Sequence, residues 1–386
     1  MQFEFSTAFR IIFGSGKLNS IGSLIKEFGN TALIVSGAPQ GILDKLLEQL
    51  NINQEKYFII VTVHEPTVDV IRQVVATARQ KSLQLVIGIG GGSAIDTAKA
   101  TAALLTNSGD VTDYLEVIGR NMPLINPSLP LIAVPTTSGT GSEVSRNAVI
   151  GSPTHKVKVS LRSNYLLPSI ALIDPELTIS VPPSITAITG LDALTQLIEP
   201  FTCNSPNPLT DAICLEGIQR VAHSLFLAYD EGQDIHAREE MSLASLFSGL
   251  ALANAKLGAV HGLAGPIGGE ISAHHGAICA SLLPNAMDVN ISALINRSPD
   301  HPALERYSKI GKILCGDPMA TAESGIRWVR NFCLHAKIQS LSDIGLTEAQ
   351  FTNIIENAMK ASSMRGNPIT LTLNELRNIL QMSMYF

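Results

Sequence analysis

The stretch of sequence that decides the fold is LVIGIGGGSAIDTAKATAALL, Leu85–Leu105. It starts with a short apolar run, Leu85–Ile89, and passes through the glycine-rich segment Gly88–Ser93 into a run of helix formers, Ala94–Leu105. A strand, a glycine turn and a helix in this order leave unpaired backbone N–H groups at the helix N-terminus, where they can bind a phosphate. The segment is neither a GxGxxG fingerprint nor a Walker A motif. It therefore predicts a phosphate-binding loop, with a simple tight turn between strand and helix as the alternative.

Segments around this stretch repeat the same alternation of strand and helix. Short apolar or β-branched runs predict strands at Thr31–Ser36, Tyr57–Val63 and Pro130–Val134. Helical spacing of apolar residues predicts helices at Ile42–Leu50 and Asp69–Lys81. The alternation favours a Rossmann-like α/β domain, in which helices cover both faces of a parallel sheet. We expect two later runs to close that sheet, Val157–Leu161 and Ile170–Ile173.

The pattern changes after Asp174 and Pro175. Long segments with apolar residues at helical spacing replace the β-branched runs, for example at Pro208–Tyr229, Ala237–Ala253 and Leu304–Leu314. The second half therefore predicts an all-helical domain. We expect two domains, residues 1–180 and residues 181–386, with a hinge at Val181–Ser184.

Charge, hydropathy and cysteine usage narrow the class of protein. The 27 basic and 33 acidic residues give a net charge of −6 without a basic stripe, which argues against nucleic acid as a partner. No apolar run reaches the roughly 18 residues of a membrane-spanning helix, and the first residues lack the basic segment and apolar core of a signal peptide. The five cysteines form no CxxC pair, which favours small buried hydrophobic residues in a reducing compartment. We therefore expect a cytoplasmic protein with no membrane or nucleic-acid partner.

Two further motifs carry polar residues after predicted elements. PTTSGTGSE, Pro135–Glu143, follows a strand, and ligands in open α/β sheets lie at that edge. A hydroxyl-rich turn with local hydrogen bonds is the alternative. In the motif GLDALTQLIE, Asp192 and Gln196 stand four residues apart and share a helix face. Asp192 could also lie in a first turn and cap its helix.

The richest motif is VHGLAGPIGGEISAHHG, Val260–Gly276, which holds three of the nine histidines. His261 and His275 are fourteen residues apart, so the chain must turn back for both to meet, and Gly268-Gly269 offers a place for that turn. Ordinary hydrogen-bonded histidines at two helix ends are the alternative. Together with Asp192, His261 and His275 supply one carboxylate and two imidazoles, a set that suits Fe(II) or Zn(II). Such an ion polarises a carbonyl or stabilises an alkoxide, and beside a dinucleotide loop it indicates hydride transfer.

At this point the sequence resembles the iron-dependent (group III) alcohol dehydrogenases. The segments that carry the resemblance are FGSG, GGGSAIDTAKA, PTTSGTGSEVS, ALIDPELT, GLDALTQLIEP, NPLTDA, the HG and HHG pair, and MRGNP. They span nearly the whole chain in the family's order and spacing. The resemblance implies a dehydroquinate-synthase-like fold, with an N-terminal cofactor domain, a helical C-terminal domain and a cleft between them. It also implies NAD- or NADP-linked interconversion of a small alcohol and its aldehyde or ketone, with Fe(II) or Zn(II), in a homodimer or larger assembly.

The resemblance also implies roles for individual residues. Metal ligands are matched by Asp192, His261 and His275, and the family's fourth ligand, a histidine, is replaced by Gln196. The pyrophosphate loop and its helix are matched by Gly90, Gly91, Gly92, Ser93, Asp96 and Lys99. The surroundings of the phosphates and the nicotinamide are matched by Thr136, Thr137, Thr140, Lys158 and Leu172.

Three positions depart from the family pattern. The amide of Gln196 offers an oxygen that suits harder ions, so affinity for Fe(II) or Zn(II) should fall. Gly265 replaces a histidine linked to proton relay, and His274 is the candidate substitute. Gly37 replaces an aspartate that binds the ribose 2′-hydroxyl and repels a 2′-phosphate, so NADP is admissible and favoured over NAD.

Two other functions stay open. One is a metal-independent reductase of the maleylacetate reductase type, which the intact Asp192, His261 and His275 argue against. The other is a catalytically weak dinucleotide-binding protein, which the changes at Gln196 and Gly265 would allow. Metal content separates the first from the favoured dehydrogenase, and turnover with alcohols and aldehydes separates the second.

Overall fold

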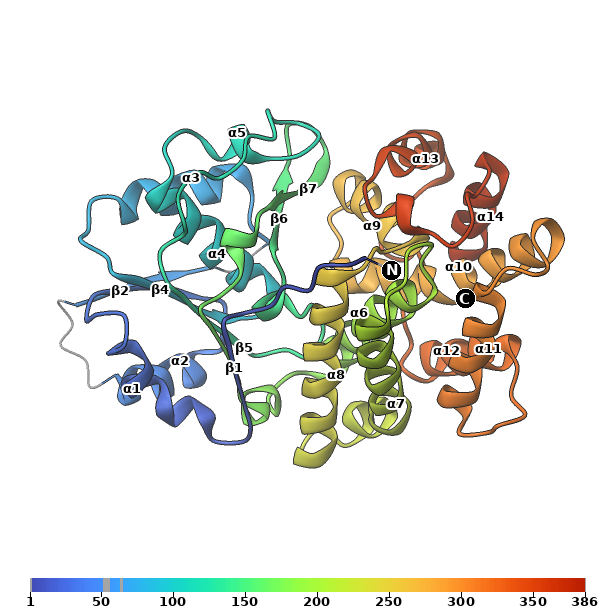
Figure 1. Ribbon diagram of the computed structural model, residues 1–386, viewed down its shortest axis with the longest axis horizontal. Coiled ribbons are helices and arrows are strands. Elements are labelled where there is room, and N and C mark those ends of the chain that lie inside the picture. The colour runs from blue at the N-terminus through green and yellow to red at the C-terminus, as the bar shows by residue number, and fades with distance from the viewer. Residues whose placement is uncertain (1, 51–55, 63–64, 386) are drawn as a thin grey trace. The chain divides into compact units, whose positions relative to one another are not determined.

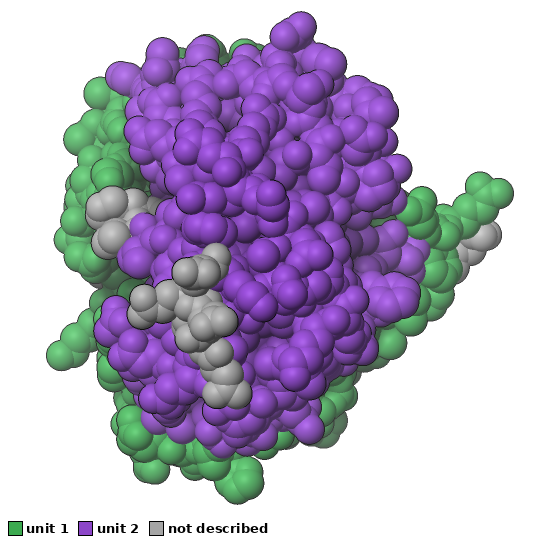
Figure 2. Space-filling model, turned by 90° about the vertical axis from the view of Figure 1, so that its left-hand side faces the viewer, with its two compact units in different colours: residues 1–4, 181–386 green, residues 5–180 purple. Residues whose placement is uncertain are grey.

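The chain folds into two compact units, which are coloured separately in Figure 2. The α/β unit is Phe5–Ser180, and the helical unit combines Met1–Glu4 with Val181–Phe386. The structure is a computed structural model that describes residues 2–50, 56–62 and 65–385. Within these ranges all strands belong to the α/β unit.

The α/β unit is built on a six-stranded sheet in the order β1-β8-β5-β4-β2-β3. All neighbouring strands in it run parallel. The strands are β1 (Arg10–Phe13), β2 (Ala32–Ser36), β3 (Tyr57–Val61), β4 (Leu85–Gly90), β5 (Leu131–Pro135) and β8 (Ile170–Ile173). The predicted Rossmann-like parallel sheet is confirmed. Val63, the end of one predicted strand, lies outside the described residues.

Helices cover both faces of this sheet because its strands are apolar on both sides. The helices are α1 (Ile21–Ile25), α2 (Gln40–Gln49), α3 (Val68–Ala78), α4 (Gly92–Thr106) and α5 (Val111–Tyr114). Successive residues of β2 point to opposite faces. Ile34 packs in the cluster that holds Leu46 of α2, whereas Leu33 packs in the one that holds Val74 of α3 and Ala98 of α4. This layering is visible in Figure 1.

One predicted strand belongs to a different sheet. Val157–Leu161 was expected to close the main sheet, and this prediction is wrong: β7 (Val157–Arg162) pairs antiparallel with β6 (Asn147–Ser152) in a separate two-stranded sheet. The reason lies in the alternation of polar and apolar residues, since a half-buried strand cannot replace one that is covered on both faces. Val159 and Leu161 pack with residues of α3 and α4, while β1 pairs with β8 at the sheet edge.

The helical unit contains nine α-helices among its described residues. They are α6 (Pro183–Thr202), α7 (Pro208–Asp230), α8 (Ile235–Asn254), α9 (Ala259–Glu270), α10 (His275–Arg297), α11 (Ala303–Cys315), α12 (Ala322–His335), α13 (Phe351–Lys360) and α14 (Leu373–Ser383). One hydrophobic cluster runs through all of them. The predicted all-helical second half is therefore confirmed.

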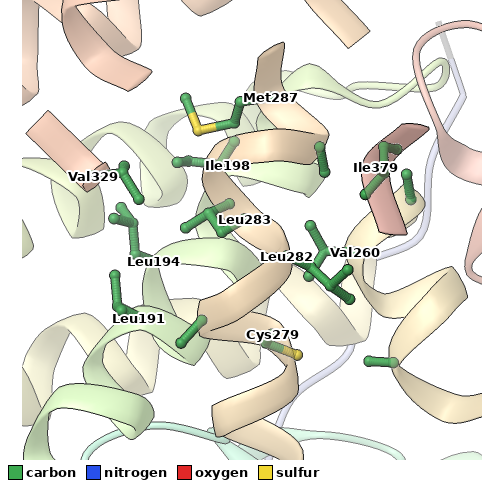
Figure 3. Close-up of a cluster of buried hydrophobic side chains, with 14 of the residues drawn as sticks. Leu191, Leu194, Ile198, Val260, Cys279, Leu282, Leu283, Met287, Val329 and Ile379 are labelled. Carbon is green, nitrogen blue, oxygen red and sulfur yellow. The ribbon is translucent and has the colours of Figure 1, made fainter. Parts of the chain in front are cut away.

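Helix α10 lies at the centre of this cluster. Figure 3 shows Leu283 of α10 beside Leu194 of α6, with Val329 of α12 and Ile379 of α14 on either side of the helix. By length and apolarity α10 could cross a membrane, as could α8 and α9 if that bent pair formed one span. However, 83% of the apolar window of α10 is buried inside the molecule. Its apolar residues are thus explained by packing against the surrounding helices.

Candidate functional site

Helix α6 presents three polar side chains on one buried face. Asp192, Gln196 and Glu199 stand four and then three residues apart, the spacing that aligns side chains on a helix. All three are buried, and Gln196 Nε2 donates a hydrogen bond to Asp192 Oδ2 at 3.1 Å. Because α6 begins at Pro183, Asp192 lies well inside the helix, so the capping role considered for it does not apply.

Glu199 fixes both the start of α9 and the ring of His261. The residue before α9 is Gly258, which has no side chain to cap the helix. Asn367 Oδ1 accepts the first N–H of α9 at 3.0 Å, and Glu199 Oε1 accepts that of Val260 at 2.7 Å. The other oxygen of Glu199 lies 2.6 Å from His261 Nδ1. This contact assigns a proton to Nδ1 and directs Nε2 toward Asp192, 3.7 Å from its Oδ1.

The chain turns back between α9 and α10, but not where the glycines predicted. Gly268 and Gly269 lie inside α9, and the turn is formed by Ile271–His274. His274 caps α10, since its Nδ1 accepts the N–H of Gly276 at 3.3 Å. His275 is the first residue of α10 and faces the site. His274 therefore has a structural role at an exposed position, and a role in proton relay stays an untested prediction.

The turn brings the predicted ligands together. His275 Nε2 lies 4.0 Å from Asp192 Oδ1, and the rings of His261 and His275 have centroids 5.6 Å apart. Cys279, one turn further along α10, joins them: ligand atoms of Asp192, His261, His275 and Cys279 all lie within 4.8 Å of one another. A carboxylate, two imidazoles and a thiol thus converge on one point in the helical unit.

Unpaired buried atoms mark the same point. In the described part of the chain, eight buried side-chain nitrogen and oxygen atoms have no hydrogen-bond partner, and three of them are Asp192 Oδ1, Gln196 Oε1 and His261 Nε2. Leaving such an atom unpaired costs about 1–3 kcal/mol. A divalent cation would satisfy all three, because a carboxylate oxygen, an amide oxygen and an imidazole nitrogen are metal-binding atoms. The residues present therefore fit a metal ion.

The electrostatics of the cluster agree with this fit. Burial alone would raise the pKa of Asp192, but the nearby imidazoles of His261 and His275 lower it to about 2. Burial alone would lower the pKa of His261, but the two carboxylates of Glu199 and Asp192 raise it to about 10. Without a metal, a proton on His261 Nε2 thus holds the positive charge that the carboxylates favour. A divalent cation can replace this proton.

The glycine loop of the α/β unit lies at the carboxyl edge of its sheet. Gly90 has a φ of +145°, and a Cβ there would lie 2.9 Å from Ala94 Cβ and 3.0 Å from Gly37 Cα. Gly91 is the N-cap of α4, and Ser93 lies in the helix's first turn. The ends of β2, β4 and β5 therefore meet where ligands bind in open α/β sheets.

The hydroxyl-rich segment after β5 lies against this loop. Thr136 N donates to Gly90 O at 2.9 Å, which extends the pairing of β4 with β5. The glycines of the loop leave room for two threonines of this segment. A Cβ added to Gly91 would lie 3.5 Å from Thr137 Oγ1, and one added to Gly92 would lie 2.8 Å from Thr140 Cγ2. The predicted cofactor residues Gly37, Gly90, Gly91, Gly92, Ser93, Thr136, Thr137 and Thr140 are thus brought together.

Asp96 and Lys99 point into the α/β unit instead. Lys99 is fully buried, and its Nζ donates to Ser145 O, Ser145 Oγ and Asn147 O at 2.8–3.0 Å. Asp96 accepts from Ser142 Oγ at 2.5 Å and from the N–H of Val149 at 3.0 Å. The resemblance assigns Asp96 and Lys99 to the pyrophosphate loop and its helix, and a role of their side chains at the cofactor stays a prediction. They fasten the segment after β5 to α4.

Two other predicted cofactor residues also have internal partners. Leu172 is fully buried in β8 and packs in the cluster that holds the residues of α1 and α2, so its side chain belongs to the core. Lys158 on β7 forms an ion pair with Glu65. Neither residue is brought to the glycine loop by an observed contact, and their predicted roles at the cofactor stay untested.

Two residues of the site were not predicted from the sequence: Glu199, which supports His261, and Cys279, which belongs to the metal-ligand cluster. Glu199 stood in the quoted motif without a role, although it follows Asp192 and Gln196 on the same helix face. The sequence analysis predicted Cys279 to be a buried hydrophobic residue, because the cysteines form no CxxC pair. Its position four residues after His275 on one helix would have indicated it.

A phosphate-binding loop in one unit and a metal-ligand cluster in the other are the two parts that a metal-assisted, dinucleotide-dependent oxidoreductase requires. Comparison with known proteins gives the family. Residues 8–175 match the family described as "Iron-containing alcohol dehydrogenase", and residues 186–384 match "Fe-containing alcohol dehydrogenase family, C-terminal". The chain belongs to the iron-containing alcohol dehydrogenase family, and it is an NAD(P)-dependent, metal-containing alcohol dehydrogenase of that type.

Individual relatives support this assignment over the full length. Long-chain-alcohol dehydrogenase 1 of Geobacillus thermodenitrificans is 39% identical over 380 residues, which are 95% of this chain and 93% of the relative. Alcohol dehydrogenase 4 of Schizosaccharomyces pombe is 35% identical over 97% of this chain and 87% of its own length. The solved alcohol dehydrogenase from Oenococcus oeni superposes with a TM-score of 0.89 at 31% identity and covers 99% of this chain and 100% of that one.

Proposed function

We propose that the helical unit binds one divalent metal ion through Asp192, His261 and His275, with Gln196 as a neutral fourth ligand, and that the enzyme interconverts a small alcohol and its aldehyde or ketone there. The observation that carries this proposal is the set of three unpaired buried atoms, Asp192 Oδ1, Gln196 Oε1 and His261 Nε2. When bound, the ion supplies Lewis acidity for a carbonyl or alkoxide oxygen. Iron is the metal for which the family is named.

The residues around the cluster prepare it for this task. Glu199 keeps a proton on His261 Nδ1 and so leaves Nε2 for the metal. Gln196 holds one carboxylate oxygen of Asp192 through its NH₂ group and leaves the other oxygen unpaired. Burial of these side chains excludes water and strengthens their electrostatic interactions. In the α/β unit, the N–H groups at the start of α4 would bind the pyrophosphate of the dinucleotide.

We further propose that NADP is accepted as well as NAD, and is the preferred dinucleotide. No carboxylate stands at Gly37, the residue after β2, to repel a 2′-phosphate. Gly37 also has a packing role, since an added Cβ would lie 3.1 Å from Ala94 Cβ. Gly37→Asp should therefore be compared with Gly37→Ala, which introduces the same crowding without the charge. A ratio of kcat/KM for NADP over NAD that falls in the aspartate variant alone would support the proposal.

One experiment tests the metal-dependent reaction. The purified enzyme is analysed for metal and assayed with short alcohols and aldehydes and both dinucleotides, before and after chelation. We expect about one metal per chain, activity that is lost with the metal, and recovery when Fe(II) or Zn(II) is returned. Turnover that persists after confirmed metal loss would favour the metal-independent reductase, and dinucleotide binding without any turnover would favour a binding protein.

The predicted cytoplasmic location and homodimer are part of the same proposal. All five cysteines are free, which is expected in a reducing compartment. Light scattering of the purified protein tests the dimer, and fractionation of the source cells tests the location.

A further inference from the structure

We propose that Cys279 is a thiolate ligand of the metal ion. This inference rests on the proposed metal site and adds a donor that the resemblance to the family did not supply. Cys279 lies on α10, four residues after His275, so the two side chains share a face of the helix. Figure 3 shows Cys279 on α10, at the end of the labelled hydrophobic cluster.

The geometry places the sulfur at the point where the other ligand atoms meet. Cys279 Sγ lies 3.5 Å from His275 Nε2, the same nitrogen that lies 4.0 Å from Asp192 Oδ1. Every pair of ligand atoms among Asp192, His261, His275 and Cys279 is separated by no more than 4.8 Å. Metal–sulfur and metal–nitrogen bonds of about 2.3 and 2.1 Å allow two ligand atoms of one ion to be up to about 4.4 Å apart. Small side-chain movements would therefore suffice to place all four atoms on one ion.

The burial of Cys279 is consistent both with a metal ligand and with a residue of the hydrophobic core. Cys279 is fully buried, as are Cys214 and Cys333, but those two lie outside the cluster of ligand atoms. A thiolate in an apolar interior needs a positive partner, and a metal ion supplies one. The three cysteines thus allow a comparison between one buried thiol within the cluster of ligand atoms and two buried thiols outside it.

The donor set has a consequence for the choice of metal. The amide oxygen of Gln196 is a hard ligand, whereas a thiolate is soft and favours Zn(II) or Co(II) over Mn(II) or Mg(II). Coordination by Cys279 would therefore offset the weak affinity expected from Gln196. Binding converts the thiol to a thiolate, and the released proton leaves to solvent without any change in oxidation state.

The experiment loads metal-free enzyme with one Co(II) per chain and records its absorption spectrum. We expect visible ligand-field bands and, in the near ultraviolet, a sulfur-to-cobalt charge-transfer band. The charge-transfer band should disappear in Cys279→Ser and Cys279→Ala and persist in the matched control Cys333→Ala. Affinity for Zn(II) should fall at least about tenfold in Cys279→Ser, with a smaller fall for Mn(II).

The outcomes separate this inference from the proposed function. Ligand-field bands without the charge-transfer band in the unmodified enzyme would overturn coordination by Cys279 and leave the metal site intact. A charge-transfer band that survives in Cys279→Ser would also overturn it. Failure of the unmodified enzyme to bind Co(II), Zn(II) or Fe(II) at all would overturn both proposals.

Discussion

The metal cluster and the glycine loop solve the problem of binding a charged ligand in opposite ways. In the helical unit, buried side chains are held in place while Asp192 Oδ1 and His261 Nε2 are left unpaired. In the α/β unit, the residues at the start of α4 are only half-buried, and the nearby charged side chains of Asp96 and Lys99 are hydrogen-bonded within the protein. A cluster of unpaired buried atoms therefore indicates where a ligand is needed, and hydrogen-bonded charged groups indicate scaffold. Four substitutions test that distinction.

The largest effect is expected for Asp192→Asn. This change removes the buried carboxylate that lies between the two imidazoles. Metal content should fall well below one per chain, and kcat/KM should fall about 1,000-fold, the scale of several kcal/mol of lost charge stabilisation. Metal analysis and steady-state kinetics measure both. Asp230→Asn is the matched control, because Asp230 also pairs with a histidine, His335, but on the surface. Full metal content in Asp192→Asn would contradict the assignment.

A smaller effect is expected for Glu199→Gln. This change alters the residue that orients His261 and leaves His261 itself in place. The amide oxygen of the glutamine can still accept a hydrogen bond from the N–H of Val260. The NH₂ group of the same amide cannot accept one from His261 Nδ1. The imidazole would then carry its proton on Nε2, where the metal should bind. Metal affinity should fall about 10- to 100-fold with the fold intact. Titration with Zn(II) checks the affinity, and unchanged binding would show that Glu199 serves only α9.

Function of the glycine loop should depend on the space around its backbone, whereas function of the metal cluster should depend on the charges of its side chains. In Gly92→Ala, the new Cβ would lie 2.8 Å from Thr140 Cγ2 and 2.9 Å from its Oγ1. Overpacking of this kind costs about 1–3 kcal/mol, so KM for the dinucleotide should rise about tenfold while metal content stays unchanged. Gly41→Ala is the control, since nothing lies within 4 Å of a Cβ there. An equal rise of KM for the dinucleotide in Gly92→Ala and Gly41→Ala would contradict a specific role of the loop in binding it.

The same distinction explains what could be predicted from the sequence. Local patterns identified the strand, glycine loop and helix at Leu85–Leu105, because apolar periodicity and glycines act over a few residues. The candidate ligands Asp192, His261 and His275 were predicted from their residue types and from the resemblance to the family, and the structure brings them together. The strand Arg10–Phe13 was missed because its partner, β8, lies about 160 residues later in the chain.

Orientation was the part that local patterns could not supply. Whether Asp96 and Lys99 point toward a ligand or into the protein depends on Ser142 and Ser145, which reach them only after the chain has folded. The turn after α9 was misplaced because Pro266, Gly268 and Gly269 are tolerated inside that helix once it is packed. Tertiary contacts overrode the local preference in both cases.

The smallest effect is expected for Glu143→Gln, beside the loop. Burial raises the pKa of Glu143 from 4.5 to about 7, although its own backbone N–H and the charge of Lys99 act in the opposite direction. The folded protein thus holds this proton more tightly than the unfolded chain. Its contribution to stability is complete below pH 4.5 and is lost as the pH rises through about 7. Relative to the glutamine variant, the unmodified protein should lose on the order of 2 kcal/mol between pH 5 and pH 8.

The midpoint of urea unfolding, measured for both proteins across this range, tests the prediction. The carboxylate of Asp192, at the metal cluster, has its pKa lowered to about 2, because positive groups face it there. The positive charge that acts on Glu143 is that of Lys99, and Lys99 already donates its hydrogen bonds to Ser145 and Asn147. A difference between the two midpoints that does not change with pH would show that Glu143 is ionised in the folded protein throughout, and that this charge too has a partner.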